Sequence, residues 1–440
     1  MKLKDFFLSL ILLPIFFNCE KNRIDQNQSN PLIESLARHQ LNLSQNPLEW
    51  KDEELEFIDV FADARIIGLG EASHGSKEFF EAKHRIFRYL VENFGFKVFA
   101  FEADFGESLY INDAIQESRT SDIKDLMLSK MHFWTWKTME VQHLLEWMSE
   151  NNRDKNDRDK IHYIGIDCQF NTYHPGLLKN YLEQTNAVFY DFAKEILDEA
   201  KEVSRISYEN FNLTEYNDLL NKVNNLADSL SLNKDQLIFN STPEEYHLYR
   251  QILNVLKQSL TVGYHSSKQV HDKNYRDEYM AENVEWILDY KKDCKIALWA
   301  HNGHVANNPQ GGWMGSHLNS SLNEDYKIIG FSFSHGSFTA VGMGGEDNTG
   351  LKSHTLTKEP LLGTLNELFS RSKTSVFGVL IEDLISEAIW NNLFESELKM
   401  FSLGAVYNGN PEAYYSPIKK TYYNAIIYFD STRASELLIN

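Results

Sequence analysis

The stretch from Ile66 to Gly75 reads IIGLGEASHG and decides the predicted fold. An apolar strand enters a glycine turn, which presents the carboxylate of Glu71 and the imidazole of His74 three residues apart. A helical pattern begins directly after the turn. Open α/β sheets present functional groups in this way, at the carboxyl ends of their strands. The stretch therefore predicts a strand, a reactive turn and a helix in succession.

Several other short runs have the character of buried parallel strands. They are continuously apolar rather than alternating, as strands covered on both faces are. With residues 65–69 they are residues 97–101, 161–166, 295–300, 327–333, 375–381 and 423–429. Helical periodicities lie between them. We therefore predict an α/β fold, a three-layer sandwich around a mostly parallel sheet.

Composition and periodicity divide the chain into five segments. They are a lipoprotein-type signal peptide (1–18), a lipid-proximal tether (19–40), a first part of the α/β core (41–175), a helical insertion (176–290), and a second part of the core with a smaller C-terminal α/β or α+β subdomain (291–440). The insertion is predicted from long helical periods in a region with few glycines.

The N-terminus predicts export. An apolar run from Phe6 to Phe17 follows a short basic start and is shorter than the ~20 residues that span a bilayer. It ends just before Cys19, where a bacterial lipoprotein signal places its lipid-modified cysteine. We expect a membrane-anchored lipoprotein of the cell envelope, lipidated at Cys19. Ordinary secretion and a hydrophobic cytosolic N-terminus are the alternatives.

The overall composition excludes several classes of protein. The 440 residues are 42% apolar, with only 9 Pro and 22 Gly, which argues against disorder and collagen-like repeats. The net charge of −20 disfavours a nucleic-acid partner, which requires Lys and Arg. Cys168 and Cys294 fall on or beside strand-like runs, and the sequence leaves open whether they are free or paired.

Four of the predicted strands end in polar residues. Glu71 and His74 follow the first, Glu102 and then Asp104 follow the second, Asp167 follows the third, and His301 and His304 follow the fourth. Taken singly, the carboxylates could cap helices or loops, and a lone histidine is usually a surface or core residue. Repeated four times, the pattern predicts convergence at one edge of one sheet.

This set of residues favours the activation of water. A G-x-S-x-G elbow is absent from the sequence, and no Ser or Cys is placed as a nucleophile. A histidine base whose tautomer is held by a carboxylate is the simplest use of such a site. The alternative is a metal-dependent hydrolase, in which a divalent ion such as zinc binds Glu71, His74, Glu102, His301 and His304. A third possibility is a surface lipoprotein that binds a ligand without catalysis. No other cofactor is expected, because the turn lacks the third glycine of a dinucleotide fingerprint.

Several motifs in order resemble the erythromycin esterase family. They are GLGEASHGSKEFF (68–80), FAFEADF (99–105), FWTWKTMEVQHLLEWM (133–148), RDEYMAENV (276–284), WAHNGHV (299–305) and YNAIIYFD (423–430). The resemblance covers about residues 60–430. It implies an α/β core with a helical insertion, and hydrolysis of a macrolide lactone without a covalent intermediate. It also implies that His74 is the base for water, with Glu71, Glu102, His301 and His304 in the site. With the chemistry of the site, we expect a hydrolase that acts on a small-molecule ester or lactone substrate.

The resemblance also implies an arginine on the helix after the first motif. Lys83 stands at that spacing and Arg85 lies two residues further on. Lysine does not reproduce the bidentate fork of arginine, so this departure separates the predicted chemistry from a particular substrate such as a macrolide. The candidate substrate-binding residues are Lys83, Arg85, Asp104, Asp167 and Trp136. Macrolide resistance is an expectation that follows from the resemblance alone.

Overall fold

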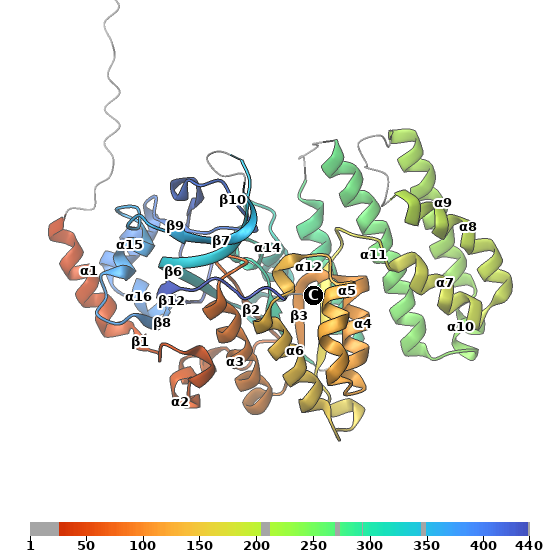
Figure 1. The fold of residues 1–440 in the computed structure, drawn as a ribbon, viewed down its shortest axis with the longest axis horizontal. Coiled ribbons are helices and arrows are strands. Elements are labelled where there is room, and N and C mark those ends of the chain that lie inside the picture. Colours follow the sequence, from red (N-terminus) through yellow and green to blue (C-terminus); the bar gives the residue numbers. More distant parts are fainter. Residues whose placement is uncertain (1–25, 204–211, 269–272, 293, 345–348, 439–440) are drawn as a thin grey trace, which may run out of the picture.

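The structure is a computed structural model that describes residues 26–203, 212–268, 273–292, 294–344 and 349–438 (Figure 1). The predicted signal peptide and the lipidation of Cys19 lie outside the described residues. Among the described residues, no helix combines the length and apolar character that crossing a membrane requires.

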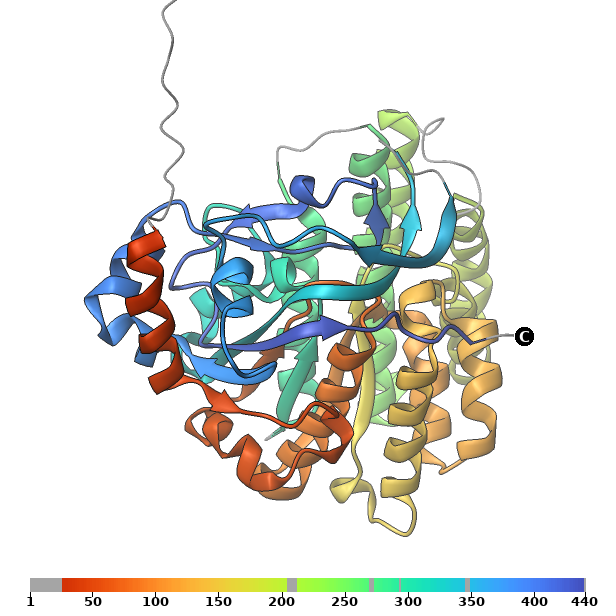
Figure 2. The same ribbon diagram turned by 60° about the vertical axis from the view of Figure 1, so that its left-hand side comes forward.

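A large, mostly parallel sheet forms the centre of the molecule, as predicted (Figures 1 and 2). Its order is β1-β8-β12-β6-β2-β5-β3-β4. The parallel neighbours are β12 (Ala425–Thr432), β6 (Tyr326–Gly342), β2 (Ile66–Leu69), β5 (Lys295–Trp299), β3 (Phe96–Asp104) and β4 (His162–Asp167). The four strands with polar ends are therefore adjacent and parallel, and their carboxyl ends lie along one edge.

Most of the remaining strands depart from the predicted parallel pattern. The run at 375–381 forms β8 (Val376–Leu380), which is antiparallel to β12, so the prediction of its direction was wrong. A strand covered on both faces is apolar throughout whichever way it runs, so its sequence carries no direction. The other strands are β1 (Leu41–Asn42), β7 (Gly350–Leu356), β9 (Lys399–Phe401), β10 (Val406–Tyr407) and β11 (Tyr415–Pro417).

Both faces of the sheet are covered, because alternate strand residues enter two separate cores. Ile66 packs in a core with the insertion and with α12 (Tyr275–Tyr290) and α14 (Met314–Leu322). Ile67 packs in the other core with α3 (Lys77–Phe94) and α6 (Met139–Asn152). This arrangement gives the predicted three layers.

The helical insertion stands to one side of the sheet (Figure 1). Its helices are α7 (His174–Thr185), α8 (Ala187–Val203), α9 (Leu213–Leu232), α10 (Lys234–Phe239) and α11 (Pro243–Ser267). The remaining α-helices are α2 (Asp52–Leu55), α4 (Phe105–Gln116), α5 (Ile123–Lys130), α13 (Asn302–Val305), α15 (Leu365–Ser370), α16 (Ile381–Ser386) and α17 (Ala388–Glu395).

The segment predicted as a tether is partly helical. α1 spans Gln26–His39, and its Leu32 and Leu36 are buried in the first core. Arg38 on the same helix pairs with Glu387 at 2.8 Å. The polar composition of residues 20–32 concealed the apolar pair, whose i,i+4 spacing places both leucines on one helix face.

Candidate active site

The turn after β2 brings Glu71 and His74 into contact. Nδ1 of His74 lies 2.6 Å from Oε1 of Glu71. The turn depends on glycine at both ends: a Cβ at Gly70 would lie 2.2 Å from the Asn302 side chain, and one at Gly75 would lie 2.0 Å from the carbonyl oxygen of Thr339. The side chain of His74 is 12% exposed, so it is the accessible member of the pair.

The other oxygen of Glu71 accepts hydrogen bonds from two buried side chains. Lys83 Nζ donates to Oε2 at 2.5 Å, and Trp299 Nε1 donates to the same oxygen at 2.7 Å. Burial opposes the charge on Glu71, but Lys83 and His74 outweigh it and lower the pKa of this carboxyl. Burial lowers the pKa of Lys83 to about 8, against the opposing effect of Glu71. Lys83 is fully buried and is placed to position Glu71; its contact with substrate stays a prediction.

Glu102, at the end of β3, contacts the segment that follows β5 directly and reaches the end of β4 through Arg276. Its Oε2 accepts from the backbone N–H of His301 at 2.9 Å. Its Oε1 lies 2.6 Å from Arg276 Nη2 and 3.2 Å from His304 Nε2. Burial favours the neutral acid, but His304 and Arg276 outweigh it and hold the pKa of Glu102 well below its usual range.

His304 lies between two carboxylates. Its Nδ1 is 2.6 Å from Oδ1 of Asp277, and its Nε2 faces Glu102. Burial works against protonation, yet Glu102 and Asp277 raise the pKa of His304 to about 10. Arg276 Nη1 also lies 3.1 Å from Nε2, but the surrounding carboxylates outnumber this one guanidinium. His304 is therefore an imidazolium at neutral pH.

His301 is neutral by contrast. The N–H of Gly303 donates to its Nδ1 at 3.1 Å, so the ring proton is on Nε2, which donates to the carbonyl of Leu403 at 3.2 Å. Burial, with His74 and His304 nearby, lowers the pKa of His301 to about 3. Its ring centroid is 5.2 Å from that of His74 and 6.3 Å from that of His304. His301 therefore lies close to both of the other imidazoles.

The structure therefore brings together the five residues predicted as catalytic: Glu71, His74, Glu102, His301 and His304. It adds Arg276 and Asp277, which sequence reasoning did not assign to the site. Arg276 also binds both oxygens of Asp167, at 3.1 and 2.8 Å, and so ties the end of β4 to the end of β3. The sequence signal was the RDEYMAENV motif, which returns from the insertion to the sheet edge as the start of α12.

The other predicted substrate-binding residues are buried and bonded to protein groups, and their contact with substrate stays a prediction. Trp136 is 1% exposed and donates to the carbonyl of Glu102 at 3.1 Å. Arg85 donates to the carbonyl of Trp50 at 2.7 Å and pairs with Asp52, on the other side of α3. Asp167 is fully buried and binds Arg276.

Asp104 is also fully buried and caps α4 by accepting from the N–H of Glu107 at 2.9 Å. Burial, together with Glu107, raises the pKa of Asp104 well above its usual range.

The geometry disfavours the five-residue metal site. Glu71 and Glu102 are each bonded to a side-chain cation, Lys83 and Arg276, which competes with a metal ion for the same oxygens. In the described part of the chain, the His, Cys, Asp and Glu ligand atoms that gather within 4.8 Å of one another belong to a different group: Asp104, Glu107 and His132.

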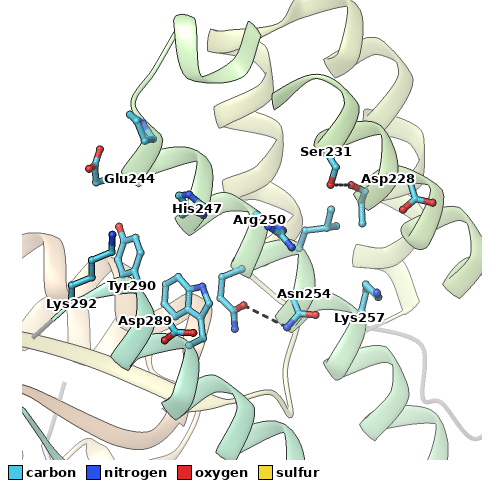
Figure 3. Close-up of a pocket in the computed structure, with 15 residues that line it drawn as sticks. Asp228, Ser231, Glu244, His247, Arg250, Asn254, Lys257, Asp289, Tyr290 and Lys292 are labelled. Atoms are coloured by element: carbon cyan, nitrogen blue, oxygen red, sulfur yellow. Dashed lines mark hydrogen bonds between the residues drawn. The ribbon is translucent and has the colours of Figure 1, made fainter. Parts of the chain in front are cut away.

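A cavity of about 810 Å³ lies elsewhere, between α9, α11 and α12 (Figure 3). Its labelled lining includes Asp228, His247, Arg250 and Asp289, a mixed set of charges. No residue of the histidine–glutamate cluster lines it. The histidine–glutamate cluster and this cavity are thus on different parts of the molecule.

The fold and site define an α/β protein whose sheet edge carries a cluster of histidines, glutamates and an arginine, a set of groups compatible with an esterase-like hydrolase. The chain belongs to the erythromycin esterase family, whose sequence model, described as "Erythromycin esterase", matches residues 91–432.

Curated relatives agree with this, and solved structures share the fold. The chain is 28% identical to erythromycin esterase type II of Escherichia coli over 64% of this chain and 72% of that one. It is 25% identical to a putative hydrolase, YbfO, of Bacillus subtilis, over 76% and 77%. A Bacillus cereus protein of known structure shares the fold with a TM-score of 0.81 at 20% identity, covering 93% of this chain and 99% of that one. A mutant of erythromycin esterase EreC in its open conformation has a TM-score of 0.67 at 16% identity, covering 90% and 98%.

Proposed function

We propose that this protein hydrolyses an ester or cyclic ester of a small molecule, using water activated by His74. One observation carries the proposal: the 2.6 Å contact between Nδ1 of His74 and a Glu71 carboxylate that Lys83 and Trp299 hold in place. Because Nδ1–H donates to Glu71, the lone pair is on Nε2, which is free to accept a proton from water.

The reaction follows from this tautomer. His74 Nε2 takes a proton from water while the oxygen adds to the ester carbonyl. The negative charge that develops on the carbonyl oxygen is stabilised by the imidazolium of His304 and by Arg276, which are fixed in place before reaction. As the tetrahedral intermediate collapses, the C–O bond breaks and His74 returns the proton to the departing alkoxide. No covalent enzyme intermediate is formed.

The substrate class is supported by the relatives. Two of them are named erythromycin esterases, types I and II of Escherichia coli, so a macrolide lactone is one candidate and macrolide resistance one consequence. Lys83 replaces the arginine that the family resemblance implies, so simple esters and other lactones are candidates too. An exported lipoprotein anchored through Cys19, as the N-terminal sequence predicts, would meet such a substrate outside the cytoplasm.

The test is a panel of simple esters, lactones and several macrolides, monitored by mass spectrometry for the addition of water. With an active substrate, His74→Asn should lower kcat/KM about 10³-fold with the fold intact, since general bases contribute ~10²–10⁴-fold. His335→Asn is the matched control, because His335 pairs with Glu359 at 3.2 Å on the surface, outside the site. Retained activity in His74→Asn would contradict the proposal that His74 is the general base. A silent wild-type protein across the panel would favour ligand binding over catalysis.

A further inference from the structure

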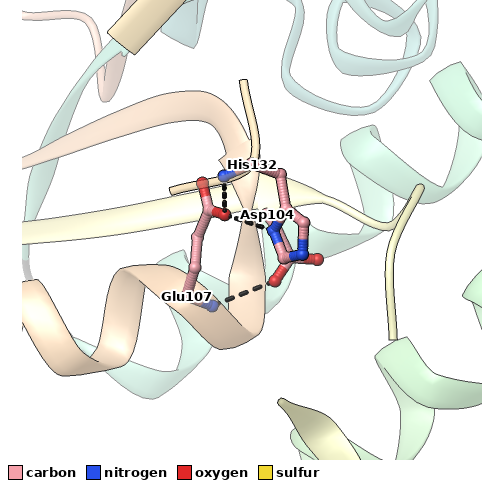
Figure 4. A group of neighbouring side chains, drawn as sticks. All are labelled: Asp104, Glu107 and His132. Carbon is pink, nitrogen blue, oxygen red and sulfur yellow. Dashed lines mark hydrogen bonds and ion pairs between the residues drawn. The ribbon is translucent and has the colours of Figure 1, made fainter. Parts of the chain in front are cut away.

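A second group of potential ligands lies at the same edge of the sheet (Figure 4). Asp104 ends β3, Glu107 lies in the first turn of α4, and His132 follows α5. One ligand atom from each lies within 4.8 Å of the other two. The reaction proposed above uses none of these three side chains.

The carboxylates of this group are buried without full hydrogen bonding. Glu107 Oε2 accepts from the N–H of His132 at 2.7 Å and lies 2.6 Å from its Nδ1. Among the described residues, Oε1 of Glu107 and Oδ2 of Asp104 have no hydrogen-bonding partner, although both side chains are fully buried. Buried polar atoms are rarely left in this state, since each costs about 1–3 kcal/mol. No lysine or arginine in the described part of the chain pairs with either carboxylate.

A fully buried histidine faces the same group. His174 begins α7, and neither of its ring nitrogens has a hydrogen-bonding partner among the described residues. A Cβ at Gly106 would lie 3.1 Å from His174 Nδ1 and 3.3 Å from Asp104 Oδ1, so the imidazole and the carboxylate meet across this glycine. Because Gly106 has no side chain, nothing separates the imidazole of His174 from the carboxylate of Asp104 at this position.

We propose that Asp104, Glu107 and His132 bind a divalent transition-metal ion such as Zn²⁺ or Mn²⁺, with His174 as the neighbouring fourth donor. One or two imidazoles with two carboxylates form a mixed nitrogen and oxygen set that suits these ions.

The surroundings of His132 fit the role of a ligand. Its Nε2 lies 2.9 Å from the hydroxyl oxygen of Thr172, which accepts the Nε2–H and leaves Nδ1 as the ligating nitrogen. Nδ1 would exchange its contact with Glu107 for the ion, and the proton between them would be released.

Such an ion would fasten the insertion to the sheet. The ligands come from β3, α4 and the segment after α5, and His174 begins the first helix of the insertion. Asp104 is also paired with Asp167 in the register of β3 and β4, next to Arg276. The proposal stands on these contacts alone and does not depend on the hydrolytic activity.

The experiment uses the full chain after treatment with a chelator and dialysis. Zn²⁺ and Mn²⁺ are titrated by calorimetry, and the melting temperature is measured with and without each ion. We expect one ion per chain and a higher Tm in the metal-bound form, because the ion binds the folded state. Asp104→Asn keeps an oxygen that can cap α4 but loses the charge, and His132→Ala removes a partly exposed ring. Each should weaken binding by about 100-fold or more and abolish the Tm shift.

Two controls make the result specific. His39→Ala removes a histidine that pairs with Glu387 at 2.9 Å and, among the described residues, belongs to no three-ligand group, and it should leave metal affinity unchanged. His74→Asn should also leave it unchanged. No binding to the wild-type protein overturns the proposal. Binding that survives both Asp104→Asn and His132→Ala but is lost in His74→Asn also overturns it, because the ion would then be in the hydrolytic cluster.

Discussion

Two clusters of histidine and carboxylate lie at one sheet edge and differ in what balances their negative charge. In the hydrolytic cluster, Glu71 is bonded to Lys83 and Glu102 to Arg276, at 2.5 and 2.6 Å. In the neighbouring cluster, Asp104 and Glu107 lie close together, and in the described part of the chain only the imidazole of His132 forms an ion pair with either.

The comparison shows that residue type alone does not decide the chemistry of such a site. Where the chain supplies its own cation, the carboxylate stays ionised, holds a histidine tautomer and needs no metal ion for its charge. Where two buried carboxylates lack a cation, a metal ion is the natural partner. The predictions below test the first half of this comparison, and the metal titration tests the second.

The largest expected effect is on stability, from Lys83→Met. The substitution leaves the Glu71 carboxylate buried without its cation, and breaking a fully buried pair costs about 3–5 kcal/mol. Urea unfolding of wild type and variant measures this loss. The double variant Glu71→Gln with Lys83→Met removes both charges and should recover most of it. A loss below about 1 kcal/mol in Lys83→Met would show that Lys83 does not balance Glu71.

The next effect is on catalysis, from Arg276→Lys. Lysine keeps the positive charge but cannot bond to Glu102 and Asp167 together, so Glu102 and the His301 backbone that it holds lose their fixed positions. We expect kcat to fall about 10- to 100-fold with a smaller change in KM, because positioning errors act mainly on the transition state. Steady-state kinetics on the active substrate measures the split. Equal kcat in both proteins would show that the two-sided bonding of Arg276 to Glu102 and Asp167 does not matter for catalysis.

The sequence predicted those parts of the molecule that depend on local pattern. Continuous apolar runs identified the strands, and because parallel strands share one carboxyl edge, Glu71, Glu102 and His301 could be expected to converge. The direction of β8 could not be predicted, since a strand buried on both faces has no directional signal.

Other features of the site could not be predicted, for a different reason. The family resemblance and its spacing placed Lys83 among the substrate-binding candidates, but they did not show that its side chain points toward Trp299, where Nζ lies 4.2 Å from the ring centroid. Arg276 lies near the far end of the predicted insertion, 109 residues after its partner Asp167, and no local pattern reports such a contact. A shorter separation in sequence, 25 residues, likewise conceals the approach of His132 to Glu107.

The smallest expected effect is a pH dependence of stability that belongs to His304. Burial opposes its protonation, but Glu102 and Asp277 raise its pKa from 6.5 to about 10 in the folded protein. Above pH 6.5 the unfolded chain releases this proton while the folded chain keeps it, so stability falls as pH rises towards 10.

Lys83 has the opposite effect on stability, because burial lowers its pKa to about 8 in the folded protein. Its folded form therefore releases a proton before the unfolded form does, but only above that pH. Between these two effects, in the window of pH 6.5–8, one proton on His304 changes stability by about 1–2 kcal/mol. Burial raises the pKa of Glu81 to about 7, so this carboxyl adds its own fall in stability up to that pH, and the comparison with a His304 variant separates the two. Urea unfolding across this window should show a falling midpoint in wild type and a flatter profile in His304→Gln. An unchanged slope in the variant would mean that His304 is neutral, and the positive charge behind Glu102 would then come from Arg276 alone.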